Sequence, residues 1–251
     1  MLSGKISSIM AELSVASWNI LLDGNYPQEE RIDDIIGTLK EVHRIHALGA
    51  LGIMEAQETL LGHSGQMIAQ ALFGNDGAWQ LHSRKKRKEH IGLAGSEIEE
   101  VEFVELGHSK YAALTQAAGV TVATVHLRKK RGQEQVEQMD ALLERLEEES
   151  QVVLMGDFNG IKLQIPRQKV WRQNYRSVFT ELNMKRQYTV PTPEFKGMLT
   201  RPERIGAFIL GGGVNVDDIY VRGVDVIGAG YFKGRSDHLG VWADLETKTA
   251  V

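Results

Sequence analysis

Short apolar runs recur along the whole chain and give the first indication of its fold. Their lengths suit β-strands, and polar or glycine-containing segments separate them. We predict strands at residues 13–20, 51–55, 101–106, 111–115, 120–125, 152–155, 216–221 and 239–245. So many strands require at least one large sheet.

Two longer segments between these strands have the periodicity of amphipathic helices. Apolar residues recur there at spacings of three and four, at Ile32, Ile35, Ile36, Leu39 and Val42 and again at Val136, Met139, Leu142, Leu143 and Leu146. A shorter third helix is predicted over residues 64–72. Because the first two helices each lead into a predicted strand, helices must cover a face of the sheet. The pattern therefore predicts a mixed α and β architecture.

The composition is that of an ordinary globular protein, and it narrows the chemistry. The chain has 251 residues, 42% of them hydrophobic and 25% charged, with a net charge of −4. It contains no cysteine, which excludes disulfides, cysteine-ligated zinc and cysteine nucleophiles. Any metal ion must therefore bind to oxygen or imidazole ligands.

The domain organisation is predicted to be simple. No internal repeat, proline-rich linker or low-complexity stretch divides the sequence, so residues 13–251 are interpreted as one domain. Residues 1–12 show no clear period and are predicted to be a loosely ordered end. The longest apolar stretch, residues 47–54, is too short to span a bilayer. No signal-peptide core forms before Glu12, so a cytoplasmic location is expected.

Positive charge is concentrated in two short runs. Residues 84–88 (RKKRK) and 128–131 (RKKR) hold nine of the 29 basic residues, so the rest of a chain whose net charge is −4 carries −13. Neither run has helical apolar spacing, and both are predicted to be loops. They are either solvated surface loops or a rim that binds phosphate groups.

Residues that bind metals or move protons stand where the predicted strands end. A carboxylate or amide oxygen there suits a hard cation such as Mg²⁺, which leaves its other coordination positions to water and substrate phosphate. The histidines lack the paired spacing of a zinc motif. The residues are Asn19, Glu55, His126, Asp157, Asn159, Asp217, Asp237 and His238.

Each of these residues also has an ordinary structural interpretation. An isolated Asn or Asp at a strand end often forms a turn, and an isolated histidine such as His126 is as often a hydrogen-bonded core residue. Glu55 is harder to explain in this way, because a buried carboxylate needs a partner or a metal. The segment Gly156-Asp157-Phe158-Asn159 is the most specific, since glycine lets the backbone turn where two polar side chains converge.

Taken in order, these segments resemble the sequence blocks of the endonuclease/exonuclease/phosphatase superfamily. The blocks are residues 17–20 (SWNI), 52–55 (GIME), 125–127 (VHL), 155–159 (MGDFN), 216–221 (VDDIYV) and 236–238 (SDH). The resemblance spans residues 13 to about 245. It implies an α+β, four-layer α-β-β-α DNase-I-like fold, in which two sheets pack face to face with helices outside. It also implies a metal-dependent phosphoesterase site at one end of the sandwich.

The resemblance implies a binding site for Mg²⁺ or Mn²⁺. Glu55 would be the main metal ligand, Asn19 would support the metal or the phosphate, and Asp237 would lie next to the metal. The family's usual Leu-Gln-Glu block reads Ile-Met-Glu here and a Gln-Glu pair follows, which makes Glu58 a competing choice. Glu55 is preferred because it closes a strand-like run.

The remaining block residues are implied to carry the chemistry. Asp157 would orient or deprotonate the attacking water, and Asn159 would hold the phosphate. Asp217 would pair with His238, hold it in one tautomer and favour its protonated form. His126 matches a second histidine of DNase I and sphingomyelinase relatives, a general acid or a stabiliser of the pentacovalent state, and argues against abasic-site repair. Which histidine is the acid stays open.

The basic residues favour a nucleic acid as the substrate. The second basic run starts two residues after His126, near the rim of the predicted site, where it would attract a polyanion. Trp171 and Tyr175 would add stacking, although a helix with mixed surface charge is the alternative for residues 167–176. The rim residues are Arg128, Lys129, Lys130 and Arg131.

The leading functional prediction is a metal-dependent hydrolase that cleaves phosphodiester bonds of DNA or RNA by attack of water, as an endonuclease or an exonuclease. One alternative is a phosphatase or phosphodiesterase acting on a small phosphorylated metabolite or a lipid headgroup, which the acidic net charge would suit. The other is a non-catalytic binding protein, disfavoured because every proposed catalytic position holds a competent residue. Residues 160–213, where relatives build substrate specificity, match no block.

Overall fold

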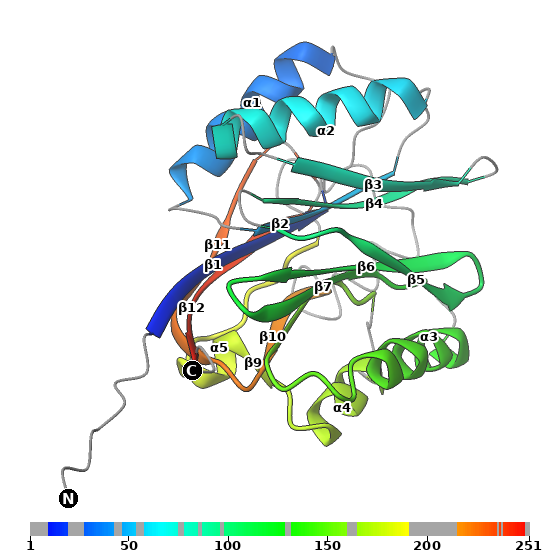
Figure 1. Cartoon of the computed structure of the whole chain (residues 1–251), viewed down its shortest axis with the longest axis vertical. Helices are drawn as coiled ribbons and strands as arrows, with labels where there is room; N and C mark the ends of the chain where they lie inside the picture. The colour runs from blue at the N-terminus through cyan, green and yellow to red at the C-terminus, as the bar shows by residue number, and fades with distance from the viewer. Residues whose placement is uncertain are drawn as a thin grey trace, which may run out of the picture.

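Two six-stranded β-sheets pack face to face in the computed structural model, and helices cover their outer faces (Figure 1). The structure describes residues 10–19, 28–42, 47–53, 58–74, 78–84, 87–95, 98–128, 132–159, 165–190, 215–234, 236 and 238–248. Within these ranges the architecture is the predicted four-layer α-β-β-α sandwich.

The first sheet brings together strands from both ends of the described chain. Its strands are β1 Met10–Asn19, β2 Ala47–Ile53, β3 Ala78–Arg84, β4 Arg87–Gly95, β11 Asp225–Phe232 and β12 Gly240–Lys248. Their spatial order is β11-β12-β1-β2-β4-β3. Strand β1 is parallel to β2 and antiparallel to β12. The strand order places both β1 and β12 inside the sheet, away from its edges.

The second sheet is built from the central part of the sequence. Its strands are β5 Glu102–Gly107, β6 Lys110–Ala117, β7 Val120–His126, β8 Val152–Asp157, β9 Arg176–Ser177 and β10 Asp217–Arg222. Their order is β5-β6-β7-β8-β10-β9. Strands β7 and β8 are parallel, and β10 is antiparallel to β8.

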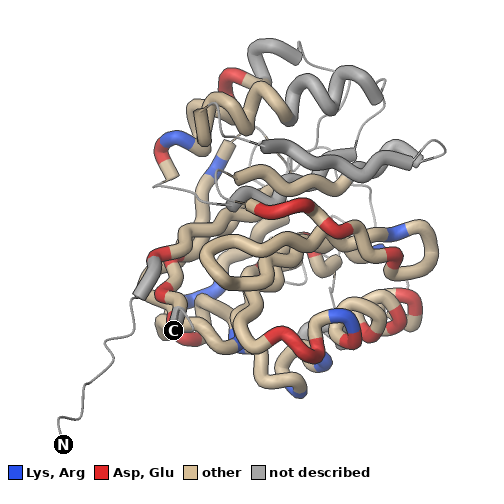
Figure 2. The backbone as a smooth tube through the Cα atoms, in the orientation of Figure 1, with Lys and Arg blue, Asp and Glu red and all other residues tan. Residues whose placement is uncertain are grey.

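The helices form the two outer layers. Helices α1 Gln28–Glu41 and α2 Glu58–Phe73 cover the first sheet, and α3 Gly132–Arg145 and α4 Ile165–Arg172 cover the second (Figure 1). The short helix α5 Val178–Glu181 follows the edge strand β9. Figure 2 shows that the charged residues along α3 are mainly acidic, and the apolar side of this helix faces the sheet. No helix in the described ranges is long and apolar enough to span a membrane.

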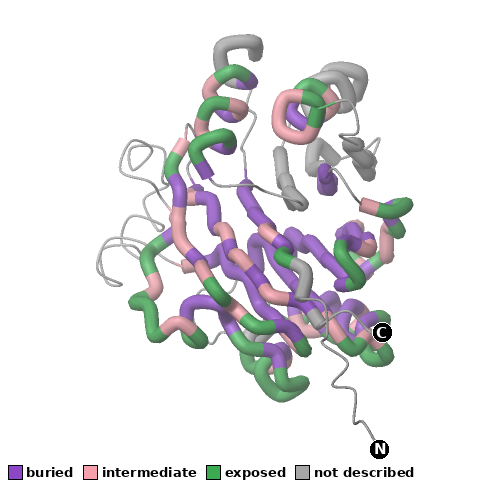
Figure 3. Tube along the Cα trace, turned by 60° about the vertical axis from the view of Figure 1, so that its left-hand side comes forward, coloured by how far each residue is buried: buried purple, intermediate pink, exposed green. Residues whose placement is uncertain are grey.

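Alternating side chains of the central strands fill two cores. Every residue of β7 and β8 is buried (Figure 3). Val122 and Val153 belong to the core between the sheets, whereas the next residues, Ala123 and Leu154, belong to the core beneath α3. The two-residue period of a strand thus explains why these segments are apolar throughout. A third core joins the first sheet to α1 and α2.

One prediction about a charged segment is wrong at its ends. Residues 84–88 were expected to be a loop, but Arg84 ends β3, and Arg87 and Lys88 begin β4. Arg84 pairs with Arg87 at the end of this hairpin. Because ladder hydrogen bonds join main-chain groups, strand pairing can continue through charged residues.

Several elements lack a clear apolar run and are not predicted by the sequence pattern. Strand β11 is an example, because glycines interrupt it where Trp242 of β12 lies against it. A Cβ at Gly230 would lie 2.6 Å from Trp242 Nε1. Strand β1 begins earlier than predicted, since Met10 still pairs with Lys248. The helix given as the alternative for residues 167–176 is present in part, because α4 ends at Arg172.

Candidate active site

Three polar residues lie side by side at one end of the second sheet. His126 is the last residue of β7, Asp157 is the last residue of β8, and Asp217 is the first residue of β10. His126 is opposite Asp157 in the parallel pair, and Asp217 is opposite Asp157 in the antiparallel pair. All three are buried. Strand register alone therefore brings residues that are distant in the sequence into one row.

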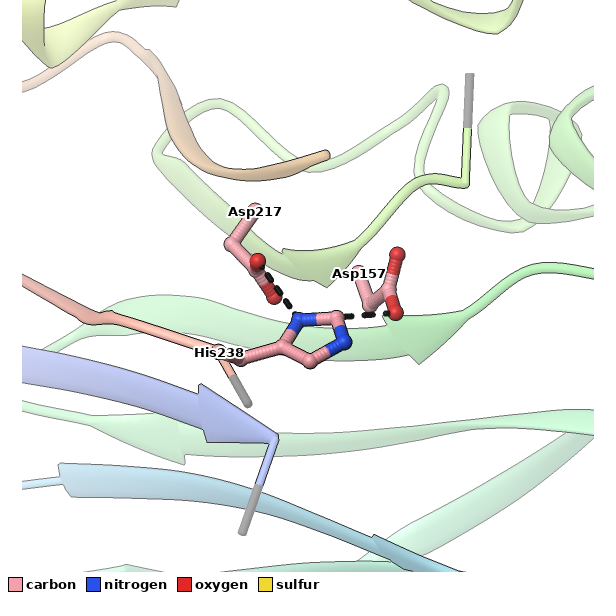
Figure 4. Close-up of side chains that lie close together, drawn as sticks. All are labelled: Asp157, Asp217 and His238. Atoms are coloured by element: carbon pink, nitrogen blue, oxygen red, sulfur yellow. Dashed lines mark hydrogen bonds and ion pairs between the residues drawn. The ribbon is translucent and has the colours of Figure 1, made fainter. Parts of the chain in front are cut away.

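The first sheet supplies two further residues at the same end of the sandwich. Asn19 is the last residue of β1, and His238 lies just before β12. His238 Nδ1 is 2.8 Å from Asp217 Oδ2 (Figure 4). Asn19 Nδ2 is 3.3 Å from Asp157 Oδ2 and 3.4 Å from His238 Nε2. The candidate site is therefore formed where the two sheets meet.

The hydrogen-bond partners of His238 favour one tautomer of its neutral ring. Asp217 can only accept, so Nδ1 carries the proton in the bond to its carboxylate. The Asn19 side-chain nitrogen is a donor and faces Nε2. In this form Nε2 is the ring atom that can take up a proton. The Asp217 carboxylate then stabilises the doubly protonated ring.

Asp157 lies at the centre of the group. Its Oδ2 is 3.3 Å from Asn19 Nδ2, 3.6 Å from His126 Nε2 and 3.9 Å from His238 Nδ1. Its Oδ1 accepts a hydrogen bond of 2.9 Å from the main-chain N–H of Asn159. The residue is only 1% exposed. A carboxylate held in this way can orient a water molecule and accept its proton.

The turn after β8 depends on a glycine and an asparagine. Gly156 has a φ of +136°, and a Cβ there would lie 2.0 Å from the carbonyl oxygen of Val125. Only glycine fits such a position. Asn159 adopts the left-handed conformation, with a φ of 48°, which asparagine tolerates better than most residues. Its Nδ2 donates to the carbonyl oxygen of Leu127 at 2.8 Å. The turn therefore brings Asp157 and Asn159 close together, as its sequence predicts.

Side-chain hydrogen bonds hold the His238 segment against β1. Trp18 is fully buried, and its Nε1 donates to the carbonyl oxygen of His238 at 3.1 Å. Ser236 Oγ donates to the carbonyl oxygen of Asn19 and accepts from the main-chain N–H of His238 at 3.2 Å. The tryptophan and serine that flank the predicted site residues therefore position them.

Thr189 is a site residue that sequence reasoning missed. Its Oγ1 accepts hydrogen bonds from the main-chain N–H groups of Val216 at 3.0 Å and Asp217 at 3.1 Å. Its carbonyl oxygen accepts from the main-chain N–H of Leu239 at 2.9 Å. Thr189 thus ties the start of β10 to the residue after His238. It lies in an irregular stretch where no apolar period marks it, so the sequence offers no signal for its role.

Solved structures of other proteins share the fold of this chain. An endonuclease/exonuclease/phosphatase from Bacteroides vulgatus has a TM-score of 0.71 at 16% identity, covering 94% of this chain and 99% of that chain. D. rerio TDP2, complexed with single-strand DNA product, has a TM-score of 0.65 at 16% identity, covering 94% and 100%. The 3′ phosphatase NExo from Neisseria, bound to product DNA hairpin, has a TM-score of 0.66 at 14% identity, covering 92% and 98%. The chain has the endonuclease/exonuclease/phosphatase fold.

The endonuclease/exonuclease/phosphatase fold confirms the architecture that the resemblance implied. No protein-family model and no curated protein matches the sequence, so the likeness lies in the shape of the chain. Within the described residues, the structure brings together Asn19, His126, Asp157, Asn159, Asp217 and His238. The predicted residues outside the described ranges are Glu55, Lys129, Lys130, Arg131 and Asp237. Glu58 is the first residue of α2.

The donor atoms at this end of the endonuclease/exonuclease/phosphatase fold suit a hard metal ion. Asp157, Asp217 and His238 each offer a ligand atom, and these atoms lie within 4.8 Å of one another. His238 Nδ1 and Asp217 Oδ2 already bind each other, and both oxygens of the Asp157 carboxylate also face hydrogen-bond donors. Asn19 Oδ1 is buried and has no hydrogen-bond partner among the described residues. An orphaned buried oxygen beside a carboxylate fits Mg²⁺ or Mn²⁺.

Arg128 is the one rim residue of the predicted basic run that the structure describes. Its Nη1 lies 2.8 Å from Glu134 Oε2 of α3, and its side chain is 24% exposed. Part of its charge is therefore neutralised by the helix that follows. This pairing directs the Arg128 side chain toward Glu134 of α3, so Arg128 is not an isolated cation.

Proposed function

We propose that this protein is a metal-dependent phosphoesterase that hydrolyses phosphodiester bonds by direct attack of water, with nucleic acid as its substrate class. The observation that carries the proposal is the buried group at the meeting point of the two sheets. It combines one central carboxylate, Asp157, with two imidazoles and an unpaired amide oxygen. Phosphodiester hydrolysis needs an in-line water, charge neutralisation and a proton for the leaving oxygen.

Asp157 is proposed to aim the attacking water and accept its proton. The carboxylate has the required position, because its Oδ1 is fixed by the Asn159 main chain while Oδ2 faces the other site residues. Asn159 would hold a non-bridging phosphate oxygen through its side-chain amide. These two residues come from one turn, so a single stretch of chain would place both the water and the phosphate.

The two histidines are proposed to handle the leaving group and the negative charge. The Asp217 carboxylate, 2.8 Å from His238 Nδ1, favours the protonated ring and orients it. His126 contacts the other carboxylate of the site, with its Nε2 3.6 Å from Asp157 Oδ2. One imidazolium would donate a proton to the leaving oxygen, and the other would stabilise the charge that develops on the phosphate.

A divalent ion would neutralise the non-bridging oxygens of the phosphate when bound. Asn19 Oδ1 would hold it from the described side of the site, next to the Asp157 carboxylate that accepts the proton of the water. Glu55 and Asp237 are the further ligands that the sequence predicts.

A nucleic acid is proposed as substrate because of the basic run beside the site. TDP2 and NExo, which share the fold, are complexed with DNA products. The second candidate is a phosphatase or phosphodiesterase acting on a small phosphate ester. The pairing of Arg128 with Glu134 favours that candidate, since this rim cation is already partly neutralised.

The test is hydrolysis of a substrate panel with Mg²⁺ or Mn²⁺ present. The panel contains single-stranded DNA, duplex DNA, RNA, bis(p-nitrophenyl) phosphate and p-nitrophenyl phosphate, with EDTA and the variant Asp157→Asn as controls. Polynucleotide cleavage that both controls abolish would support the proposal. Turnover of the small esters alone would support the second candidate. No turnover of any substrate at any metal concentration would contradict both.

A further inference from the structure

A buried glutamine of α3 contacts both loops that carry the candidate site. Gln135 Nε2 donates to the carbonyl oxygen of Arg128 at 2.7 Å and to that of Asn159 at 3.0 Å. Gln135 is only 6% exposed. One side-chain amide therefore bridges the chain just after His126 and the turn just after Asp157.

This bridge completes the set of bonds that fix Asn159. The main-chain N–H of Asn159 donates to Asp157 Oδ1 at 2.9 Å, and its Nδ2 donates to the Leu127 carbonyl oxygen at 2.8 Å. Gln135 supplies the donor for its carbonyl oxygen. Because Asn159 has a φ of 48°, its backbone conformation needs such support from the surrounding structure.

The next buried glutamine on the same helix has different partners. Gln138 Oε1 accepts from the main-chain N–H of Arg128 at 3.0 Å, and its Nε2 donates to the carbonyl oxygen of Gly107 at 3.3 Å. It is fully buried. Both glutamines bond to the main chain of Arg128, but Gln138 ties α3 to the β5–β6 turn, whereas Gln135 ties α3 to Asn159. Of the two buried glutamines in the described part of the chain, Gln135 is the one that bonds to Asn159.

We propose that Gln135 is a positioning residue, which affects the reaction by holding Asn159 in the orientation that binds the phosphate. This inference rests on the proposed phosphoesterase function. Loss of the Gln135 amide leaves two buried carbonyl oxygens without this donor, which is costly unless the chain moves. The turn then relaxes, and the Asn159 amide leaves its aligned position. Alignment matters most in the transition state, so kcat falls more than KM rises.

The experiment compares matched replacements of three glutamines on α3. Gln135→Met removes the bridge with an unbranched side chain of similar length, and Gln138→Met removes a buried pair of bonds that does not include Asn159. Gln133→Met is the exposed control, since the bond of Gln133 among the described residues goes to Glu137 on the helix surface. The free energy of unfolding is measured for each variant, together with kcat and KM on bis(p-nitrophenyl) phosphate.

We expect Gln135→Met to lower kcat about tenfold with KM changed less than about twofold. Gln138→Met should lose a similar free energy of unfolding but keep most of its kcat, and Gln133→Met should match the wild type. In an Asn159→Ala background, Gln135→Met should lower kcat by less than about twofold, because its effect runs through Asn159. Equal kcat losses for Gln135→Met and Gln138→Met, or losses that multiply with Asn159→Ala, would overturn the inference.

A second measurement separates this inference from failure of the proposed function. The ¹H–¹⁵N resonances of the Asn159 main chain and side chain are recorded for the wild type and the three variants. Gln135→Met should shift or broaden them, and Gln138→Met and Gln133→Met should leave them near their wild-type positions. Unchanged Asn159 resonances in Gln135→Met would contradict the positioning role whether or not the protein hydrolyses a phosphate ester.

Discussion

The second sheet holds His126, Asp157 and Asp217 in place by strand register, whereas the first sheet holds its histidine through side-chain hydrogen bonds. In the second sheet, main-chain ladders fix the three residues in one row. His238 lies outside its strand and depends on Trp18 and on a serine for its position. A ladder survives most side-chain replacements, but a side-chain bond is lost with a single substitution. The two halves of the site should therefore respond differently to mutation.

The largest expected effect comes from removing a charge in the ladder-held half. Asp157→Asn should lower kcat about a thousandfold, because the amide cannot accept a proton from water. Its free energy of unfolding should change by less than about 1 kcal/mol, since the ladder bonds of β8 remain. Kinetics on bis(p-nitrophenyl) phosphate and urea unfolding provide the two measurements.

The control for this change is Asp225→Asn, which alters an exposed aspartate at the start of β11. It should leave kcat at the wild-type value. An Asp157→Asn enzyme that kept more than about a tenth of the wild-type kcat would show that another group accepts the proton.

The next largest effect should come from cutting the connection between the halves at Thr189. Thr189→Val keeps the side-chain shape but leaves the N–H groups of Val216 and Asp217 without their acceptor. We expect a loss of about 1–3 kcal/mol in the free energy of unfolding and about a tenfold fall in kcat.

Thr189→Ser retains the hydroxyl and is the matched control. It should recover most of the kcat, although it loses a buried methyl group. Equal kcat values for Thr189→Val and Thr189→Ser would mean that the hydroxyl does not position Asp217.

A smaller effect is expected from removing one of the side-chain hydrogen bonds that hold His238 in the first-sheet half of the site. Trp18→Phe removes the Nε1 donor to His238 but keeps an aromatic ring against Phe232, whose centroid lies 5.3 Å away. We expect kcat to fall about threefold, because His238 loses one of the bonds that position it. The kcat of both proteins on bis(p-nitrophenyl) phosphate checks this. A kcat equal to that of the wild type would show that His238 does not need this bond.

The smallest effect on catalysis is expected at the opposite end of the second sheet. The hydrogen bond from Thr121 Oγ1, at 2.8 Å, and the neighbouring Arg145 lower the pKa of Glu149 below its ordinary value of 4.5. The ionised form is therefore favoured by folding. Its contribution to stability is present above the ordinary pKa and is lost as the pH falls through the lower pKa of the folded protein.

Glu149→Gln should accordingly reduce the free energy of unfolding by about 1 kcal/mol at pH 7 and by less in acid. Its kcat should equal that of the wild type, because the ladder between this end and the site is unchanged. Urea unfolding across a pH series measures the first effect. A stability difference that grows in acid would contradict the assignment.

The sequence predicts the strand ends that register brings together in the second sheet. His126, Asp157 and Asp217 follow or begin apolar runs, and the buried positions of β7, β8 and β10 make those runs visible. A strand that is buried on both faces is recognisable in the sequence as a continuous apolar run, even though apolar and polar residues do not alternate in it. The order of layers followed from the helices between the strands and from the resemblance of the blocks.

Contacts made by irregular segments could not be predicted in the same way. Thr189 precedes β10 by a long stretch of sequence, and only the folded chain shows that its hydroxyl meets Asp217. Gln135 lies on the inner face of α3 and bonds to Asn159. The sequence alone does not distinguish it from the polar residues on the surface of this helix. Strand β11 was missed because Trp242 supplies the bulk that its glycines lack. Each of these depends on a partner that is distant in sequence.

The position of β12 has a consequence for protein synthesis. This strand follows all the other described strands in sequence, yet it lies between β11 and β1 and pairs with β1 as far as Ser17. A nascent chain that has emerged from the ribosome only as far as β11 already contains Asp157 and Asp217 but not His238. Until β12 joins β1, the edge of β1 is open and the candidate site lacks His238. The order of translation thus delays assembly of the candidate site until the sandwich can close.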